Sequence, residues 1–529
     1  MAEKKKKEKR VDVPNQGHKH IFGTTEKSDF ILNMTGDGAQ KLCTNYSIFT
    51  ILLLTLLAIP AYFTTNVGEY ELYGQVHYLS ENFIFYVGAF LMLMGFIGFL
   101  IFTITVKKGQ ISLKKSGYLL LPAVISLLAA VSCFSSEDIH SGLLGHLGRH
   151  EGLLTVMAYF GMMTVAIGIH KEELAKRLID IIVATGTFHA VVSVLQAAGI
   201  ITNFFERLFV RSGSAGADSS AGEYYYEGGA TKLNGIYING RAGSGFATSP
   251  HALAAILTVA FACAMAGAAF GKVRLRRALY SGAAVMITAG AFFAKVLPAR
   301  VGIITAGAVI LVIAVIKLIA DEKDGKSAAV VFVPAVLSAA AAIVIVLSGK
   351  APLRDKNVIV TDGYVMRWTI SNISTDAEHA LDPYSYSELV NSGEIAISDA
   401  PMLGIGPDNG VDAAASGEHG LWTDRLYNEY VDLAVTRGVP ALIFQCIFLV
   451  LSAVTIVKGV IRYLKGEGSW ISAACAGAVF AYLVQAWFNT TWVNSTYFFY
   501  LMLGLAWGLD AFAKDEEKTK GKKERKIRK

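Results

Sequence analysis

Long apolar runs separated by polar segments are the main pattern of this chain. Each run is roughly 18 to 25 residues long, enough to cross a ~30 Å hydrocarbon core as a helix. The pattern predicts an all-α polytopic membrane protein with about twelve transmembrane helices. The predicted spans are about 46–64, 83–106, 117–134, 152–169, 178–198, 251–270, 278–298, 301–319, 327–348, 439–458, 470–488 and 493–513.

The basic residues indicate the orientation of these spans. Lysine and arginine gather in both tails and in alternate short connections, which the positive-inside rule places in the cytoplasm. This distribution accounts for the net charge of +6 without a nucleic-acid partner. We therefore expect a multi-pass protein of the cell membrane, surrounded by membrane lipids, with both termini cytoplasmic. The N-terminal run MAEKKKKEKR is polar, so we expect no cleavable signal peptide.

This topology divides the chain into five parts. The two longest connections, about 199–250 and 349–438, both fall outside the cytoplasm, and a large extracytoplasmic loop therefore separates helices 9 and 10. We expect residues 350–420 to be mostly loop, with one or two short helices. The predicted parts are a basic cytoplasmic tail (1–44), transmembrane helices 1–9 (45–348), the large loop with a short amphipathic helix (349–438), transmembrane helices 10–12 (439–513) and a second basic tail (514–529).

Metal and cofactor chemistry finds no support in the sequence. The five cysteines lie in or beside apolar spans without CxxC spacing, and we interpret them as packing residues. His140, His146 and His150 share an external loop, but their spacing matches no standard ligand pattern. We predict no metal and no cofactor.

Two external arginines stand beside apolar spans where an anion could bind. Arg300 lies in LPARVGII, between two predicted spans at a tight turn near 298–300, with no acidic residue nearby in sequence. Arg241 lies in NGRAGSGFATSPHALAAIL, before a helix that Ser249 and Pro250 are expected to start. A guanidinium offers a fork of donors that matches phosphate oxygens, and a helix N-terminus also favours anions.

A short amphipathic helix is predicted before the tenth span. In TDRLYNEYVDLAVTRGVPAL, Thr423 or Asp424 would cap the helix, and Gly438 followed by Pro440 would end it. From the residues alone, this helix is either a structural brace or the cover of an active site.

Taken together, four segments resemble one known family. NGRAGSGFATSPHALAAIL, LPARVGII, APMLGIGPDNG and DRLYNEYVDLAVTRGVPALI, in this order and separated by spans, are similar to motifs of the O-antigen ligase and O-antigen polymerase superfamily. The likeness is greatest to its branch in bacteria with a single membrane and covers roughly residues 140–510. The segment GLLGHLGRHEGLL, which contains Arg149, also resembles the family's entry to a membrane span.

The resemblance implies an inverting, metal-independent glycosyltransferase at the outer face of the membrane. Its donor would be a glycan on an undecaprenyl-diphosphate carrier, and its acceptor a hydroxyl of another glycan or of a lipid-linked core. Arginines aimed at the departing diphosphate would replace a divalent cation. The residues carried over to diphosphate binding are Arg241, Arg300, Arg367, His251 and Arg149.

The proposed general base of the family is a histidine, and its position here holds Tyr427. Tyrosine titrates near 10 and is a poor base at neutral pH. Tyr427 would then position the acceptor, with His419 as the base, or a carboxylate such as Asp424 or Glu429 would serve instead. A slow or inactive protein is the third reading.

Two other function classes stay open at this point. A transporter or flippase of lipid-linked sugars would also have about twelve spans, but it predicts charges along an intramembrane path and symmetric halves. A non-catalytic relative that binds a polyprenyl glycan would share the external arginines. Ligase and polymerase differ only in the acceptor, which the motifs do not identify.

Overall fold

The computed structural model describes most of the apolar part of the chain. The described residues are 19–20, 23–24, 36–64, 70–72, 75–77, 80–107, 119–145, 149–201, 225–227, 230–233, 236–238, 243–247, 249–320, 358–359, 364–365, 384–409 and 425–509. The predicted span 327–348 lies outside them, as do most of both tails.

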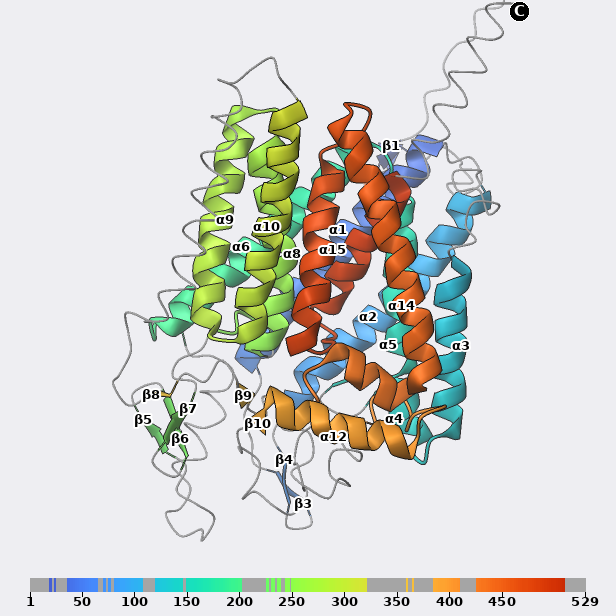
Figure 1. Cartoon of the computed structure of the whole chain (residues 1–529), viewed down its shortest axis with the longest axis vertical. Helices are drawn as coiled ribbons and strands as arrows, with labels where there is room; N and C mark the ends of the chain where they lie inside the picture. The colour runs from blue at the N-terminus through green and yellow to red at the C-terminus, as the bar shows by residue number, and fades with distance from the viewer. Residues whose placement is uncertain are drawn as a thin grey trace, which may run out of the picture.

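Helices dominate the described part, and they run roughly along one direction to form a bundle (Figure 1). Eight of them are long and apolar enough to cross a membrane, and three shorter apolar helices accompany them. This is the composition of a polytopic membrane protein. The helices of the bundle are α1 (Gly36–Thr64), α2 (Ser80–Lys107), α3 (Leu120–Ser135), α5 (Leu153–Ile167), α6 (Glu172–Ala197), α8 (Pro250–Phe270), α9 (Arg274–Ala294), α10 (Leu297–Ala320), α14 (Glu429–Leu464), α15 (Ile471–Gln485) and an unlabelled helix at Thr496–Leu509.

Short elements fill the connections. The described strands are only two to four residues long: β1 (Lys19–His20), β2 (Gly23–Thr24), β3 (Tyr70–Leu72), β4 (Gln75–His77), β5 (Tyr225–Glu227), β6 (Ala230–Leu233), β7 (Ile236–Ile238), β8 (Val358–Ile359), β9 (Tyr364–Val365) and β10 (Tyr384–Ser385). Three short helices complete the set, α4 (Ile139–Leu144), α12 (Tyr386–Asp399) and the 3-10 helix η3 (Ala486–Phe488). The large loop therefore contains a short helix, α12, which lies across one end of the bundle (Figure 1).

The centre of the bundle is α8, which is buried along almost its whole length and contacts α6, α9, α10 and α15. Ser249 caps it as predicted: its hydroxyl accepts a hydrogen bond from the Ala252 amide at 3.0 Å, and Pro250 follows in the first turn. Small residues allow other helices to approach closely. A Cβ added to Gly161 of α5 would lie 2.1 Å from the backbone oxygen of Gly95 in α2.

The turn between α9 and α10 differs from the prediction. Lys295 ends α9 in the left-handed conformation, with φ 55°, and α10 already begins at Leu297. The predicted turn near 298–300 is wrong because Pro298 is well accommodated in the first turn of a helix, where its missing N–H has no intrahelical partner anyway. Arg300 therefore lies in the first turn of α10.

The start of α14 also differs in detail. Asn428, not Thr423 or Asp424, is the cap: its side-chain oxygen accepts from the amides of Tyr430 and Val431 at 3.1 and 3.2 Å. The two residues that we predicted as caps lie outside the described part. Gly438 (φ 83°, ψ 161°) then interrupts the helix, as predicted, and separates the segment 429–437 from the membrane-crossing part.

We expect Gly438→Ala to destabilise the protein by roughly 1 to 3 kcal/mol, because the backbone conformation disfavours any Cβ. A Cβ at this position would also lie 2.3 Å from the Met402 carbonyl oxygen. Thermal unfolding in detergent measures the effect. Gly282→Ala in α9 is the matched control, since a Cβ there meets no described atom within 4 Å. Equal melting temperatures for the two variants would contradict the prediction.

Candidate functional site: a buried charged cavity

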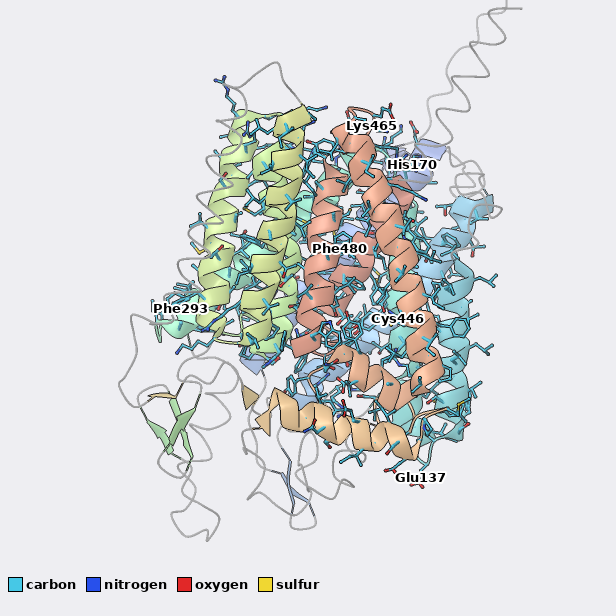
Figure 2. The ribbon with its side chains drawn as sticks, viewed as in Figure 1. Glu137, His170, Phe293, Cys446, Lys465 and Phe480 are labelled. Atoms are coloured by element: carbon cyan, nitrogen blue, oxygen red, sulfur yellow. The ribbon has the colours of Figure 1, made fainter. Side chains whose placement is uncertain are left out.

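The two ends of the bundle differ in the residues that they present. Lys465 and His170 lie at one end, and Glu137 and Phe293 lie at the other (Figure 2). The first end also holds basic residues of the short connections, such as Lys171 and Lys272, which flank α6 and α9. The second end holds α12, α4 and the start of α14 (Figure 1).

A partly open cavity lies among the elements of this second end. Its empty volume is about 650 Å³, including the open mouth. Residues before α5, after α12, at the start of α14 and after η3 line it, so four distant parts of the sequence meet here. Three arginines and four carboxylates contribute, together with apolar and hydroxyl side chains. The charged lining residues are Arg149, Arg425, Arg437, Glu151, Asp408, Glu429 and Asp432.

Arg149 and Asp408 form the first ion pair of the cavity. Arg149 is only 2% exposed, and its Nε lies 2.9 Å from the Asp408 carboxylate. It also donates to the Asp408 backbone oxygen at 2.6 Å, while the other carboxylate oxygen accepts from the Glu151 amide at 3.1 Å. Asp408 adopts a left-handed conformation, φ 63°, in the turn-rich segment LGIGPDNG. This pair holds the turns after α12 against the segment before α5.

Glu151 and Arg425 form the second ion pair. The Glu151 carboxylate accepts from the Arg425 guanidinium at 3.1 Å and from the Thr491 hydroxyl at 2.5 Å. Arg425 also donates to the Thr491 carbonyl at 2.7 Å, and its guanidinium lies 3.9 Å from the ring centroid of Trp492. Both members of the pair are buried. Separating the two residues would leave each buried charge without its partner. Breaking such a pair is therefore strongly destabilising.

The start of α14 supplies the remaining charged groups. Asp432 accepts hydrogen bonds from the Leu426 amide at 3.1 Å and from the Thr490 hydroxyl. Glu429 and Arg437 lie on the same segment, eight residues apart, and both line the cavity. Among the described residues, no carboxylate forms an ion pair with Arg437. The short helix before Gly438 thus places three charged side chains at one site.

Tyr427, which occupies the position of the family's histidine, is not among the residues that line the cavity. It is 1% exposed, adopts φ 50°, and its ring centroid lies 4.7 Å from that of His251. The His251 backbone oxygen accepts from the Asn489 side chain at 3.0 Å, which ties α8 to the segment after η3. Tyr427 and His251 are therefore packed together beside the cavity.

The other predicted site residues do not meet in the described structure. Arg300 lies half-buried in the first turn of α10 and is not among the cavity-lining residues. Arg241, Arg367 and His419 lie outside the described residues, so their roles stay predictions. Among the described residues, Arg149 and the alternative base Glu429 are the predicted residues that line the cavity.

Sequence reasoning missed most of this cavity. Glu151, Asp408, Arg425, Asp432 and Arg437 were not singled out as site residues, although Glu429 was an alternative base. A usable signal was present: acidic residues stand beside an arginine in the segments RHE and DRLYNEYVD. The long sequence separation of the partners hid their pairing.

Burial raises the pKa of the Glu151 carboxyl from 4.5 to about 7, even though Arg425 acts to lower it. The folded protein therefore keeps this proton to higher pH than the unfolded chain does. Stability should fall as pH rises from about 4.5 to about 7, by on the order of 3 kcal/mol.

Glu151→Gln should reduce this slope, because glutamine does not titrate, but it should not abolish it, since burial raises the pKa of Glu429 in the same direction. Melting temperatures of wild type and variant between pH 5 and pH 8 measure it. Glu394→Gln, an exposed residue of α12, is the control and should keep the wild-type slope. A wild-type slope in Glu151→Gln would show that other groups cause the pH dependence.

Fold and site together define a multi-pass helical membrane protein with a charged cavity at one end of its bundle. In comparisons with known proteins, no protein-family model matches the chain, and no curated protein matches it. The resemblance to the O-antigen ligase and polymerase superfamily therefore rests on the sequence motifs.

Proposed function

We propose that this protein is a glycosyltransferase of the O-antigen ligase or polymerase type. It moves a glycan from an undecaprenyl-diphosphate carrier to a glycan or lipid acceptor at the outer face of the cell membrane. Twelve spans are part of this proposal: the eleven apolar helices described, together with the predicted span 327–348. The position of the basic connections supports an extracytoplasmic cavity, with Lys465 and His170 at the cytoplasmic end.

The observation that carries the proposal is the cavity itself. Several buried ionisable groups converge there with their partners, an arrangement that is costly for stability and typical of a functional site. It also brings together two of the family-like segments, APMLGIGPDNG through Asp408 and DRLYNEYVDLAVTRGVPALI through Arg425, with the segment around Arg149.

The proposed reaction needs a base and a leaving-group site. A base removes the proton of the acceptor hydroxyl, the oxygen attacks the anomeric carbon, and the bond from that carbon to the diphosphate breaks. The diphosphate leaves with the electron pair and with negative charge, which arginines stabilise. We assign the base to Glu429, since this carboxylate lines the cavity and Tyr427 does not. Arg300 and Arg241 keep their proposed role at the diphosphate.

The central helices favour an enzyme over a transporter. The sequences of α5, α8 and α15 contain no Asp, Glu, Lys or Arg, so these interior helices offer no charged path across the membrane. The described ionic groups of the cavity instead gather at one end of the bundle.

Replacement of Arg300 and Arg241 by alanine in the native organism tests the function. Each variant should shorten or abolish a surface polysaccharide and cause the lipid-linked units to accumulate. Arg462→Ala, at the other end of α14, is the matched control and should behave as wild type. Normal polysaccharide in both Arg300→Ala and Arg241→Ala would sink the proposed function.

A further inference from the structure

The cavity carries no excess of positive charge, because its three arginines lie among four carboxyl groups. Arg149 is engaged by Asp408, and Arg425 by Glu151. Of the two further carboxyl groups, Glu429 interacts with Arg437, and Asp432 interacts with Arg425 and Arg149. No positive charge is in surplus, and a diphosphate would enter beside four carboxylates. Like charges placed together in a poorly hydrated site cost several kcal/mol. The cavity is thus unsuited to the anionic part of the donor.

Hydrogen-bonding capacity is nevertheless left over. Glu151 is 6% exposed, and its Oε1 atom is buried without a hydrogen-bond partner among the described residues. The same holds for Oε2 of Glu429, and the buried Nε of Arg437 donates to no described acceptor. All three side chains line the same cavity. Buried polar groups are normally paired, so each unpaired atom calls for a partner.

These atoms define the chemistry of that partner. A carboxyl oxygen accepts hydrogen bonds when it is ionised and offers one O–H donor when it is protonated, and the guanidinium only donates, so the partner must both donate and accept. Hydroxyl groups do both. An ammonium group would donate but would lie beside Arg437, which repels it. Val156, Leu433 and the rings of Tyr159 and Tyr500 add apolar surface to the lining.

We propose that the cavity binds one neutral, polyhydroxylated ring, a sugar of the acceptor glycan, through Glu151, Glu429 and Arg437. That the sugar belongs to an acceptor rests on the proposed function; the binding of a neutral sugar rests on the cavity alone. The diphosphate of the donor binds outside this cavity. Arg149, for which the resemblance implies diphosphate binding, positions Asp408 instead. Arg437 and Glu151 select the acceptor, and Glu429 takes its proton.

Direct binding to the purified full-length protein in detergent tests this assignment. The probes are free glucose, galactose, N-acetylglucosamine and N-acetylgalactosamine, each observed by saturation-transfer NMR, with inorganic pyrophosphate as competitor. At least one sugar should bind to wild type, and pyrophosphate should not displace it. Arg437→Gln should weaken that sugar's binding by about tenfold or more, as expected for a lost hydrogen bond from a charged group. Arg462→Gln is the matched control at the other end of α14 and should bind as wild type does.

Glu151→Gln is a second test variant. It keeps the shape of the side chain but replaces a carboxyl oxygen by an amide group that donates hydrogen bonds. It should also lose sugar binding, and its melting temperature at pH 7 establishes that it is folded. Binding of no sugar to wild type, displacement of the sugar by pyrophosphate, or unchanged sugar binding in folded Arg437→Gln would each overturn the proposal. These assays require no transfer activity. Sugar binding that depends on Arg437, combined with normal polysaccharide in the Arg300→Ala and Arg241→Ala strains, would therefore reject the proposed function and keep the sugar site.

Discussion

Glu429→Gln should lower the rate of glycan transfer by about 10²- to 10⁴-fold, the usual effect of removing a general base. Glutamine has nearly the same shape as glutamate but cannot take a proton from the acceptor hydroxyl. Purified protein with a lipid-linked donor and an acceptor glycan gives the rate directly. In cells, the same variant should accumulate lipid-linked units while the amount of folded protein stays unchanged.

Glu394→Gln is the control for this experiment, since it makes the same chemical change on the exposed face of α12. It should keep the wild-type rate. A rate for Glu429→Gln within threefold of wild type would remove Glu429 as the base. His419 and Asp424, which lie outside the described residues, would then be the next candidates.

Arg425→Met should destabilise the folded protein by roughly 3 to 5 kcal/mol, because it leaves the buried Glu151 carboxylate without its cation. It also removes the contact of the guanidinium with the Trp492 ring. Chemical unfolding in detergent measures the loss, and the yield of folded protein should fall with it.

Two further variants separate this explanation from simple loss of packing. Arg462→Met makes the same change at the other end of α14 and should cost less than about 1 kcal/mol. The double change of Arg425 and Glu151 to methionine removes both charges together and should recover much of the stability. A double variant as unstable as the sum of its parts would show that the ion pair is not the cause.

The eight long apolar helices could be predicted because the membrane imposes a simple rule. A crossing helix needs about 20 apolar residues, so length and composition alone locate it. Helix starts and interruptions could also be predicted where a residue type has one well-defined structural role. Ser249 and Pro250 started α8 as predicted, and Gly438 interrupted α14.

The cavity could not be predicted in the same way. Asp408 and Glu151 are hydrogen-bonded across 257 residues, and Arg425 and Glu151 across 274, and no local pattern encodes such pairings. The prediction of a helix end failed where several neighbouring residues could act as the cap. Asn428 lies close to Asp424 and Thr423, all three are good caps, and tertiary contacts decide among them.

The two ion pairs also share one short segment of the chain. Arg149 pairs with Asp408. Glu151, two residues after Arg149, pairs with Arg425. Asp408 and Arg425 are therefore both anchored to the same short segment before α5. A backbone shift of this segment would displace both anchored residues together, so the two ion pairs are expected to weaken jointly rather than one at a time.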